Sequence, residues 1–258
     1  MEGEHINKLL FDVNMSANSN GYRLHNIRNG VPLFVVIGNI ASGKSTLTEN
    51  IARLLGQRCC HIPEPVALWR SCGFLQQFYE NMQHYALHFQ LFAFATRAKL
   101  YKDKKWENYD LCIADSHVYT DRYVFTKSLC NRGMIMENEE SWYDIMFDSW
   151  QSIVPEMSTT MWFYLKTDPA TCKERIQTRG RPEESAIAMD YLESLNLLFD
   201  QVVEMPFIQR NVKIIEADND IGAVTDSVED YVRTYLGEQK DSVYRDSFLS
   251  SIPKGDME

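Results

Sequence analysis

The sequence predicts a three-layer α/β fold, in which a parallel β-sheet is flanked by helices on both faces. Short apolar segments alternate along the chain with segments whose apolar residues recur at helical spacing. The first apolar segment leads through a Gly-rich turn directly into a helix, as in the first half of a βαβ unit. No internal repeat or linker divides the sequence, and we therefore expect one domain over residues 31–236.

Each element has its own signal. Residues 31–37 form an apolar run that suits a strand buried on both faces, and the helix after it ends at Gly56. Asp168 and Pro169 are typical of the first positions of a helix, which follows the strand expected at residues 160–165. Further strands are expected at residues 60–62, 111–114 and 212–216, and further helices at residues 75–104, 123–129, 141–153, 185–203 and 223–236.

The composition limits the partners that we expect. Lys and Arg number 26 against 36 Asp and Glu, a formal net charge of −10. This charge disfavours a nucleic-acid partner, because such binding needs a basic surface. No apolar run approaches the ~20 residues of a membrane helix, so no membrane partner is expected. The apolar fraction of 45% is typical of a globular protein.

Both ends of the chain are polar. Residues 1–30 predict a flexible N-terminal arm, and residues 237–258 predict a polar C-terminal tail. The arm contains Glu2, Glu4 and Asp12 and has few arginines, unlike a mitochondrial transit peptide. Six scattered cysteines without a CxxC pair indicate reduced thiols. These features predict a cytoplasmic protein, with the nucleus as the alternative.

A phosphate-binding loop fills the turn after the first strand, because residues 38–45 fit the pattern G-x-x-x-x-G-K-[ST]. Its backbone N–H groups and the positive end of the next helix would converge on phosphate oxygens. Lys44 would supply charge at the β and γ phosphates, and the Ser45 hydroxyl would bind Mg²⁺. We therefore expect a nucleoside triphosphate with Mg²⁺, held by Gly38, Asn39, Ile40, Ala41, Ser42, Gly43, Lys44, Ser45 and Thr46.

Two carboxylates follow predicted strands. Glu64 lies where it can take a proton from an attacking hydroxyl group, although such a residue is more often a solvated loop acid. Asp115 ends the strand at residues 111–114, where a carboxylate of the Walker B kind would face the Mg²⁺.

Two further groups of residues are candidate binding elements. Ala86, Gln90, Ala93 and Arg97 are spaced to share one helix face, which can form a slot for a planar base read by the Gln90 amide. A core helix with two polar residues at its rim accounts for this pattern equally well. The second group is Arg175, Arg179 and Arg181, which would form an Arg-rich lid that closes over the phosphates. A solvated basic turn is the alternative interpretation of these three residues.

Together these motifs resemble the deoxyribonucleoside kinase family, which includes deoxycytidine and deoxyguanosine kinases. The resemblance rests on GNIASGKST, EPV with a later Trp, FYE with Gln90 eleven residues on, DRY, and R-x₃-R-x-R-x₂-E. It implies a P-loop kinase that transfers the γ-phosphate of ATP or another nucleoside triphosphate to the 5′-hydroxyl of a deoxynucleoside, in nucleotide salvage. It also implies a homodimer.

The same resemblance assigns roles to individual residues. Glu64 would be the general base, Gln90 would read the base between Trp69 and Phe89, and Tyr79 with Glu184 would hold the 3′-hydroxyl. Lys44, Arg179 and Arg181 would act on the transferring phosphoryl group, Arg175 would bind ATP, and Asp220 with Ile221 would belong to the adenine-binding loop. Ala93, Arg97 and Asp121 would favour deoxycytidine and purine deoxynucleosides over thymidine, because Asp121 can accept from an exocyclic amino group.

One position departs from the family pattern. The family's Glu-Arg-Ser at the strand end is Asp115-Ser116-His117 here, so an Arg is missing at Ser116. We expect slow turnover, or charge supplied by Arg122, which is near in sequence, by His117 or by a lid arginine. Two alternatives stay open: a thymidylate-type monophosphate kinase, in which DRY also occurs, and a catalytically silent nucleotide-binding subunit.

Overall fold

A computed structural model describes residues 31–103, 108–150, 160–218 and 220–237. The predicted N-terminal arm, and the predicted C-terminal tail beyond Gly237, lie outside the described residues. The strands form one parallel sheet in the order β2-β3-β1-β4-β5, which confirms the predicted three-layer α/β fold. Its strands are β1 (Leu33–Gly38), β2 (Cys59–Ile62), β3 (Leu111–Asp115), β4 (Met161–Lys166) and β5 (Val212–Glu216).

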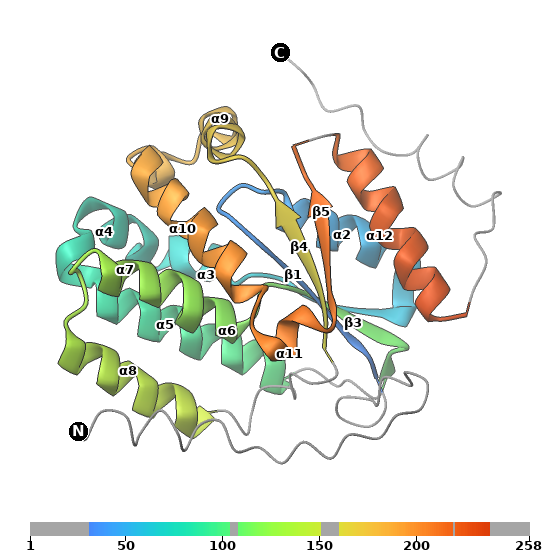
Figure 1. The fold of residues 1–258 in the computed structure, drawn as a ribbon, viewed down its shortest axis with the longest axis horizontal. Coiled ribbons are helices and arrows are strands. Elements are labelled where there is room, and N and C mark those ends of the chain that lie inside the picture. The colour runs from blue at the N-terminus through green and yellow to red at the C-terminus, as the bar shows by residue number, and fades with distance from the viewer. Residues whose placement is uncertain (1–30, 104–107, 151–159, 219, 238–258) are drawn as a thin grey trace.

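The central strand β1 is buried over its whole length, as an apolar run between two helical layers should be. Alternate β1 side chains point to opposite faces. Phe34 and Val36 pack with α2 (Lys44–Leu55) and α12 (Ile221–Tyr235). Residues of the other face pack with α10 (Met189–Val202). Figure 1 shows these helices on the two sides of the sheet.

The helix predicted at residues 75–104 is wrong in one respect, because the chain breaks it at Asn81. Helix α4 (Phe74–Glu80) ends there and α5 (Met82–Asp103) begins. The Asn81 backbone leaves the helical region at φ −147° and ψ 72°, and its side-chain Oδ1 accepts from His84 N at 3.2 Å. This side-chain cap satisfies a backbone donor of the new helix, which is why a polar residue divides the pattern.

The remaining helices are short, apart from two. They are α3 (Val66–Ser71), α6 (Val118–Thr120), the π-helical η3 (Asp121–Thr126), α7 (Lys127–Asn131), α8 (Glu137–Trp150), α9 (Pro169–Arg179), the 3₁₀ turns η1 (Gly56–Arg58) and η5 (Pro182–Glu184), and α11 (Pro206–Gln209). The cap predicted for α9 is confirmed, since Asp168 Oδ1 accepts from Ala170 N at 2.7 Å. No helix in the described part of the chain is long and apolar enough to cross a bilayer.

The strand order determines where a ligand can bind. After β1 the chain continues to β2, beyond β3, whereas after β3 it continues to β4 on the other side of β1, so these two connections run in opposite directions. At such a switch point the loops diverge beyond the carboxyl ends of the strands and leave a crevice. Both Gly38 and Asp115 end strands at this edge.

Candidate active site

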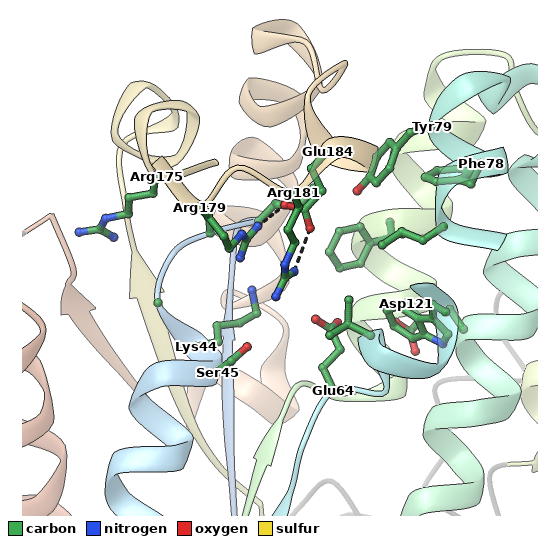
Figure 2. A pocket seen from close by; sticks show the side chains of 18 of the residues that line it. Lys44, Ser45, Glu64, Phe78, Tyr79, Asp121, Arg175, Arg179, Arg181 and Glu184 are labelled. Atoms are coloured by element: carbon green, nitrogen blue, oxygen red, sulfur yellow. Dashed lines mark hydrogen bonds and ion pairs between the residues drawn. The ribbon is translucent and has the colours of Figure 1, made fainter. Parts of the chain in front are cut away.

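A cavity of about 590 Å³ lies at this edge of the sheet, between the phosphate-binding loop, α5 and the segment that follows α9. Figure 2 shows side chains from these elements converging on it. Its volume suits a small ligand. The predicted residues that line it are Ile40, Ala41, Gly43, Lys44, Ser45, Thr46, Glu64, Trp69, Tyr79, Phe89, Gln90, Ala93, Arg97, Asp121, Arg175, Arg179, Arg181, Glu184 and Ile221.

Other predicted residues do not line the cavity. The Asn39 side chain is buried behind the loop, where Nδ2 donates to Leu192 O at 2.9 Å and Oδ1 accepts from Ile40 N at 2.8 Å. Gly38 and Ser42 lie beneath the loop surface. The Asp220 carboxylate accepts from Gly222 N at 2.9 Å and caps α12, so it belongs to helix capping rather than to the cavity wall.

The loop geometry leaves helix donors open to the cavity. Gly43 lies at φ 101° immediately before α2, and no side chain caps this helix. Its first N–H groups therefore have no side-chain acceptor and can bind phosphate oxygens. Lys44 Nζ donates to Asn39 O at 2.7 Å, which folds its side chain over the loop. Arg175 Nη2 donates to Ala217 O at 2.8 Å and ties α9 to the end of β5.

A hydroxyl and a carboxylate meet beside this loop. Ser45 Oγ donates to Asp115 Oδ2 at 2.6 Å, while Asp115 Oδ1 is buried and has no hydrogen-bond partner among the described residues. Burial, together with the Glu64 charge, raises the pKa of Asp115 to about 6. An orphaned carboxylate oxygen next to a hydroxyl is the donor chemistry that Mg²⁺ prefers. The described residues include no cluster of three or more His, Cys, Asp or Glu side chains suited to hold a metal alone. The pair fits a cation that arrives with phosphates.

A buried guanidinium group joins two carboxylates across the cavity floor. Arg97 Nε donates to Asp121 Oδ2 at 2.9 Å, and Nη2 donates to Glu64 Oε1 at 3.0 Å. The side chains of Arg97 and Asp121 are each 2% exposed, and that of Glu64 is 24% exposed. Burial would raise the pKa of Glu64, but the charges of Arg97 and Lys44 outweigh it and hold this pKa below its usual value. Burial raises the pKa of Asp121 to about 6 against the opposing charge of Arg97.

Aromatic rings form the wall beside this network. Phe89 stacks on Phe78 with ring centroids 4.6 Å apart and meets Trp69 edge-on at 5.5 Å. Gln90 and Ala93 lie on the same helix and line the cavity, so the predicted polar face of α5 is part of its wall. A small residue and an amide among rings leave room for a planar group with polar edges.

The predicted lid arginines are held by one carboxylate. Arg179 Nη2 donates to Glu184 Oε2, and Arg181 Nη1 donates to Glu184 Oε1 at 3.0 Å, as the dashed lines of Figure 2 show. Glu184 is 4% exposed. Tyr79 faces this group, and burial with the neighbouring Tyr191 and Glu184 raises its pKa well above the usual value. The lid therefore brings two cations to the phosphate side of the cavity.

The structure also overturns the expectation for Arg122. Arg122 does not approach the cavity, because Nη2 donates to Asp144 Oδ2 at 2.8 Å and to Glu140 Oε1 at 3.2 Å, both on α8. Its neighbour Asp121 points inward instead, so Arg122 cannot replace the Arg that is missing at Ser116. Ser116 is itself buried, with its Oγ 2.8 Å from Thr120 Oγ1.

Several lining residues were not predicted. Phe78 belongs to the FYE motif and lies near other aromatic residues in the sequence, and this pattern is the signal that could identify it. Phe125 and Tyr191 come from η3 and α10, and no spacing in the sequence indicates their approach. The unpredicted lining residues are Glu49, Val66, Leu75, Phe78, Phe125, Tyr191 and Ala217.

Comparisons with known proteins show what the whole chain is similar to. A family model described as deoxynucleoside kinase matches residues 34–236. A probable deoxycytidine kinase of fowlpox virus (strain NVSL) is 35% identical over 164 residues, covering 64% of this chain and 67% of the relative. Deoxycytidine kinase 2 of Gallus gallus is 34% identical over 193 residues, covering 62% and 69%. Deoxyguanosine kinase of Dictyostelium discoideum is 29% identical over 230 residues, covering 85% and 78%.

Proposed function

Because the chain belongs to the deoxynucleoside kinase family, and is therefore a kinase of deoxynucleosides, we propose that it transfers the γ-phosphate of ATP or another nucleoside triphosphate to a 5′-hydroxyl group. The observation that carries this proposal is the position of Glu64 within one cavity. The phosphate-binding loop lines one part of the cavity, and the aromatic slot lines another part. Glu64 lines the same cavity, so its carboxylate shares one space with the groups expected to bind phosphate and base.

Glu64 acts as the general base. Its lowered pKa keeps the carboxylate ionised at neutral pH, so it can accept the proton of the 5′-hydroxyl. The hydroxyl oxygen then forms a bond to the γ-phosphorus, and the bond to the bridging oxygen breaks to release the nucleoside diphosphate. Lys44, Arg179 and Arg181 stabilise the charge on the transferring group.

The remaining donors hold the nucleotide. Ser45 and Asp115 would hold Mg²⁺, which, when bound, neutralises charge on the phosphates. Arg175 and Ile221 lie beside the loop, where they contact the nucleoside triphosphate. Tyr79 and Glu184 hold the 3′-hydroxyl of the deoxynucleoside.

The base lies between the aromatic rings and the polar face of α5. Gln90 hydrogen-bonds the base edge, with Trp69 and Phe89 against its faces. Asp121 accepts from an exocyclic amino group, so deoxycytidine and purine deoxynucleosides are favoured over thymidine. The names of the relatives, deoxycytidine and deoxyguanosine kinase, support this order of preference. We also place the reaction in nucleotide salvage, in a cytoplasmic homodimer.

A transfer assay tests the proposal. Radiolabelled ATP is incubated with the full chain, Mg²⁺ and each of the four deoxynucleosides in turn, and a parallel reaction contains thymidine monophosphate. We expect labelled monophosphates, with kcat/KM highest for deoxycytidine or a purine deoxynucleoside. Label on thymidine monophosphate alone would indicate the thymidylate-type alternative. Binding of ATP and deoxynucleoside without any transfer would indicate a silent subunit.

A further inference from the structure

The strongest unexplained feature of the site is the number of groups that one arginine connects. Besides its bonds to Glu64 and Asp121, Arg97 Nη1 donates to Asp115 O at 3.3 Å. Its guanidinium carbon also lies 5.6 Å from the centre of the Trp69 ring. The side chain thus contacts residues that follow β2 and end β3, a residue of η3 and a residue of α3. The guanidinium group is a planar, rigid fork of N–H donors, and these hydrogen bonds hold it in one orientation.

The Glu64 carboxylate depends on this fork. Ser116 offers no charge, and the two other cations that influence Glu64 bond elsewhere. Lys44 donates to Asn39 O, and Arg181 donates to Glu184. Among the residues that the structure describes, Arg97 is the cation whose side chain hydrogen-bonds Glu64.

We propose that Arg97 is a positioning residue for turnover as well as a partner of Asp121 in base selection. This inference rests on the proposed role of Glu64 as general base. By holding Oε1 of Glu64, the guanidinium group fixes where the other carboxylate oxygen lies relative to the acceptor hydroxyl. Base selection and proton acceptance therefore share one side chain.

The shared side chain has a consequence that base selection alone does not have. If Arg97 acted only through the base, its replacement would affect the KM of amino-bearing bases and leave thymidine phosphorylation unchanged or improved. If it also positions Glu64, the chemical step slows by the same factor with every deoxynucleoside. Misplacement of a catalytic group by an ångström can cost about 10²-fold in rate.

The test measures single-turnover rates of phosphoryl transfer at saturating ATP, with deoxycytidine and with thymidine, in three variants. The double variant Arg97→Met with Asp121→Ala removes the guanidinium without leaving Asp121 charged and unpaired. Arg97→Lys keeps the charge but cannot bridge two carboxylates as a fork does. Arg122→Ala is the matched control, since it removes a guanidinium group that bonds to α8 and does not reach the cavity.

We expect the double variant and Arg97→Lys to lose about 10²-fold in rate with both deoxynucleosides, while their KM values diverge. Arg122→Ala should retain the rate with both deoxynucleosides within twofold of the parent. A thymidine rate within twofold of the parent in both Arg97 variants would overturn the inference and leave the proposed function intact. If the double variant does not melt cooperatively, Arg97→Lys decides by the same criterion. An unmodified chain that transfers no phosphate overturns both.

Discussion

Replacing Gly38 by Ala tests how closely the phosphate-binding loop is built onto the sheet. Gly38 ends β1 at φ 153°, in the region that L-residues rarely adopt. A Cβ at this position would lie 2.7 Å from Leu165 O and 2.7 Å from Ser42 Oγ. Leu165 is the β4 residue directly paired with Gly38, so its carbonyl cannot rotate away as a flexible side chain would.

The cost has two parts. The backbone conformation at φ 153°, which L-residues rarely adopt, costs a residue with a Cβ about 1–3 kcal/mol. Overpacking against the fixed Leu165 carbonyl costs about 1–3 kcal/mol more, because β1 and β4 must separate. We therefore expect Gly38→Ala to lower the free energy of unfolding by ~2–6 kcal/mol, the sum of these two parts.

The matched control is Gly73→Ala. Gly73 also has a positive φ, 72°, but a Cβ there would meet no atom within 4 Å. Only the conformational cost of about 1–2 kcal/mol should appear. Urea unfolding of both variants, with and without a non-hydrolysable ATP analogue, measures the difference. The reasoning is refuted if Gly38→Ala costs no more than Gly73→Ala, or if it binds the analogue as tightly as the parent does.

Three further changes test separate parts of the site. Glu64→Gln should lower kcat about 10²–10⁴-fold with little change in nucleoside binding, because an amide accepts no proton; a full kcat would exclude the base role. Arg122→Ala should retain kcat within twofold, and it should lower the free energy of unfolding by ~1–3 kcal/mol because the ion pairs with Glu140 and Asp144 are lost. A large loss of kcat would contradict the position of Arg122 outside the cavity. The pKa of Asp121 is about 6, and its acceptor form is present above that pH, so kcat/KM for deoxycytidine relative to thymidine should fall from pH 7 to pH 5. Asp121→Asn should make this ratio independent of pH, and a ratio that stays constant in the parent would count against the acceptor role.

Local chemistry explains which parts of the fold could be predicted. A buried strand, a Gly-rich turn and a capped helix each need particular residue types within a few positions, so β1, the loop and the start of α9 followed from the sequence. The break at Asn81 was missed, because an Asn within an apolar helical pattern signals a boundary only once its side chain is known to cap the next turn. Tyr191 and Phe125 were missed because they reach the cavity through tertiary packing alone.

The expectation that Arg122 supplies charge to the site is wrong for a geometric reason. The same geometry indicates that Arg97 is the better candidate for the cation that compensates for Ser116. Successive side chains of a helix point in different directions, so an inward Asp121 turns Arg122 toward α8 despite their adjacency. Nearness in sequence is therefore a poor guide to which cation compensates for Ser116. Arg97 lies 33 positions from Glu64, but β2 and β3 are neighbouring strands, and their carboxyl ends bring Glu64 and Asp115 to the same edge of the sheet. Helix α5 crosses that edge, so its arginine contacts both residues. The spacing that marked Arg97 as part of a base-binding face was informative about the helix. It contained no information about the carboxylate on the facing loop, which only the strand order brings within hydrogen-bonding distance.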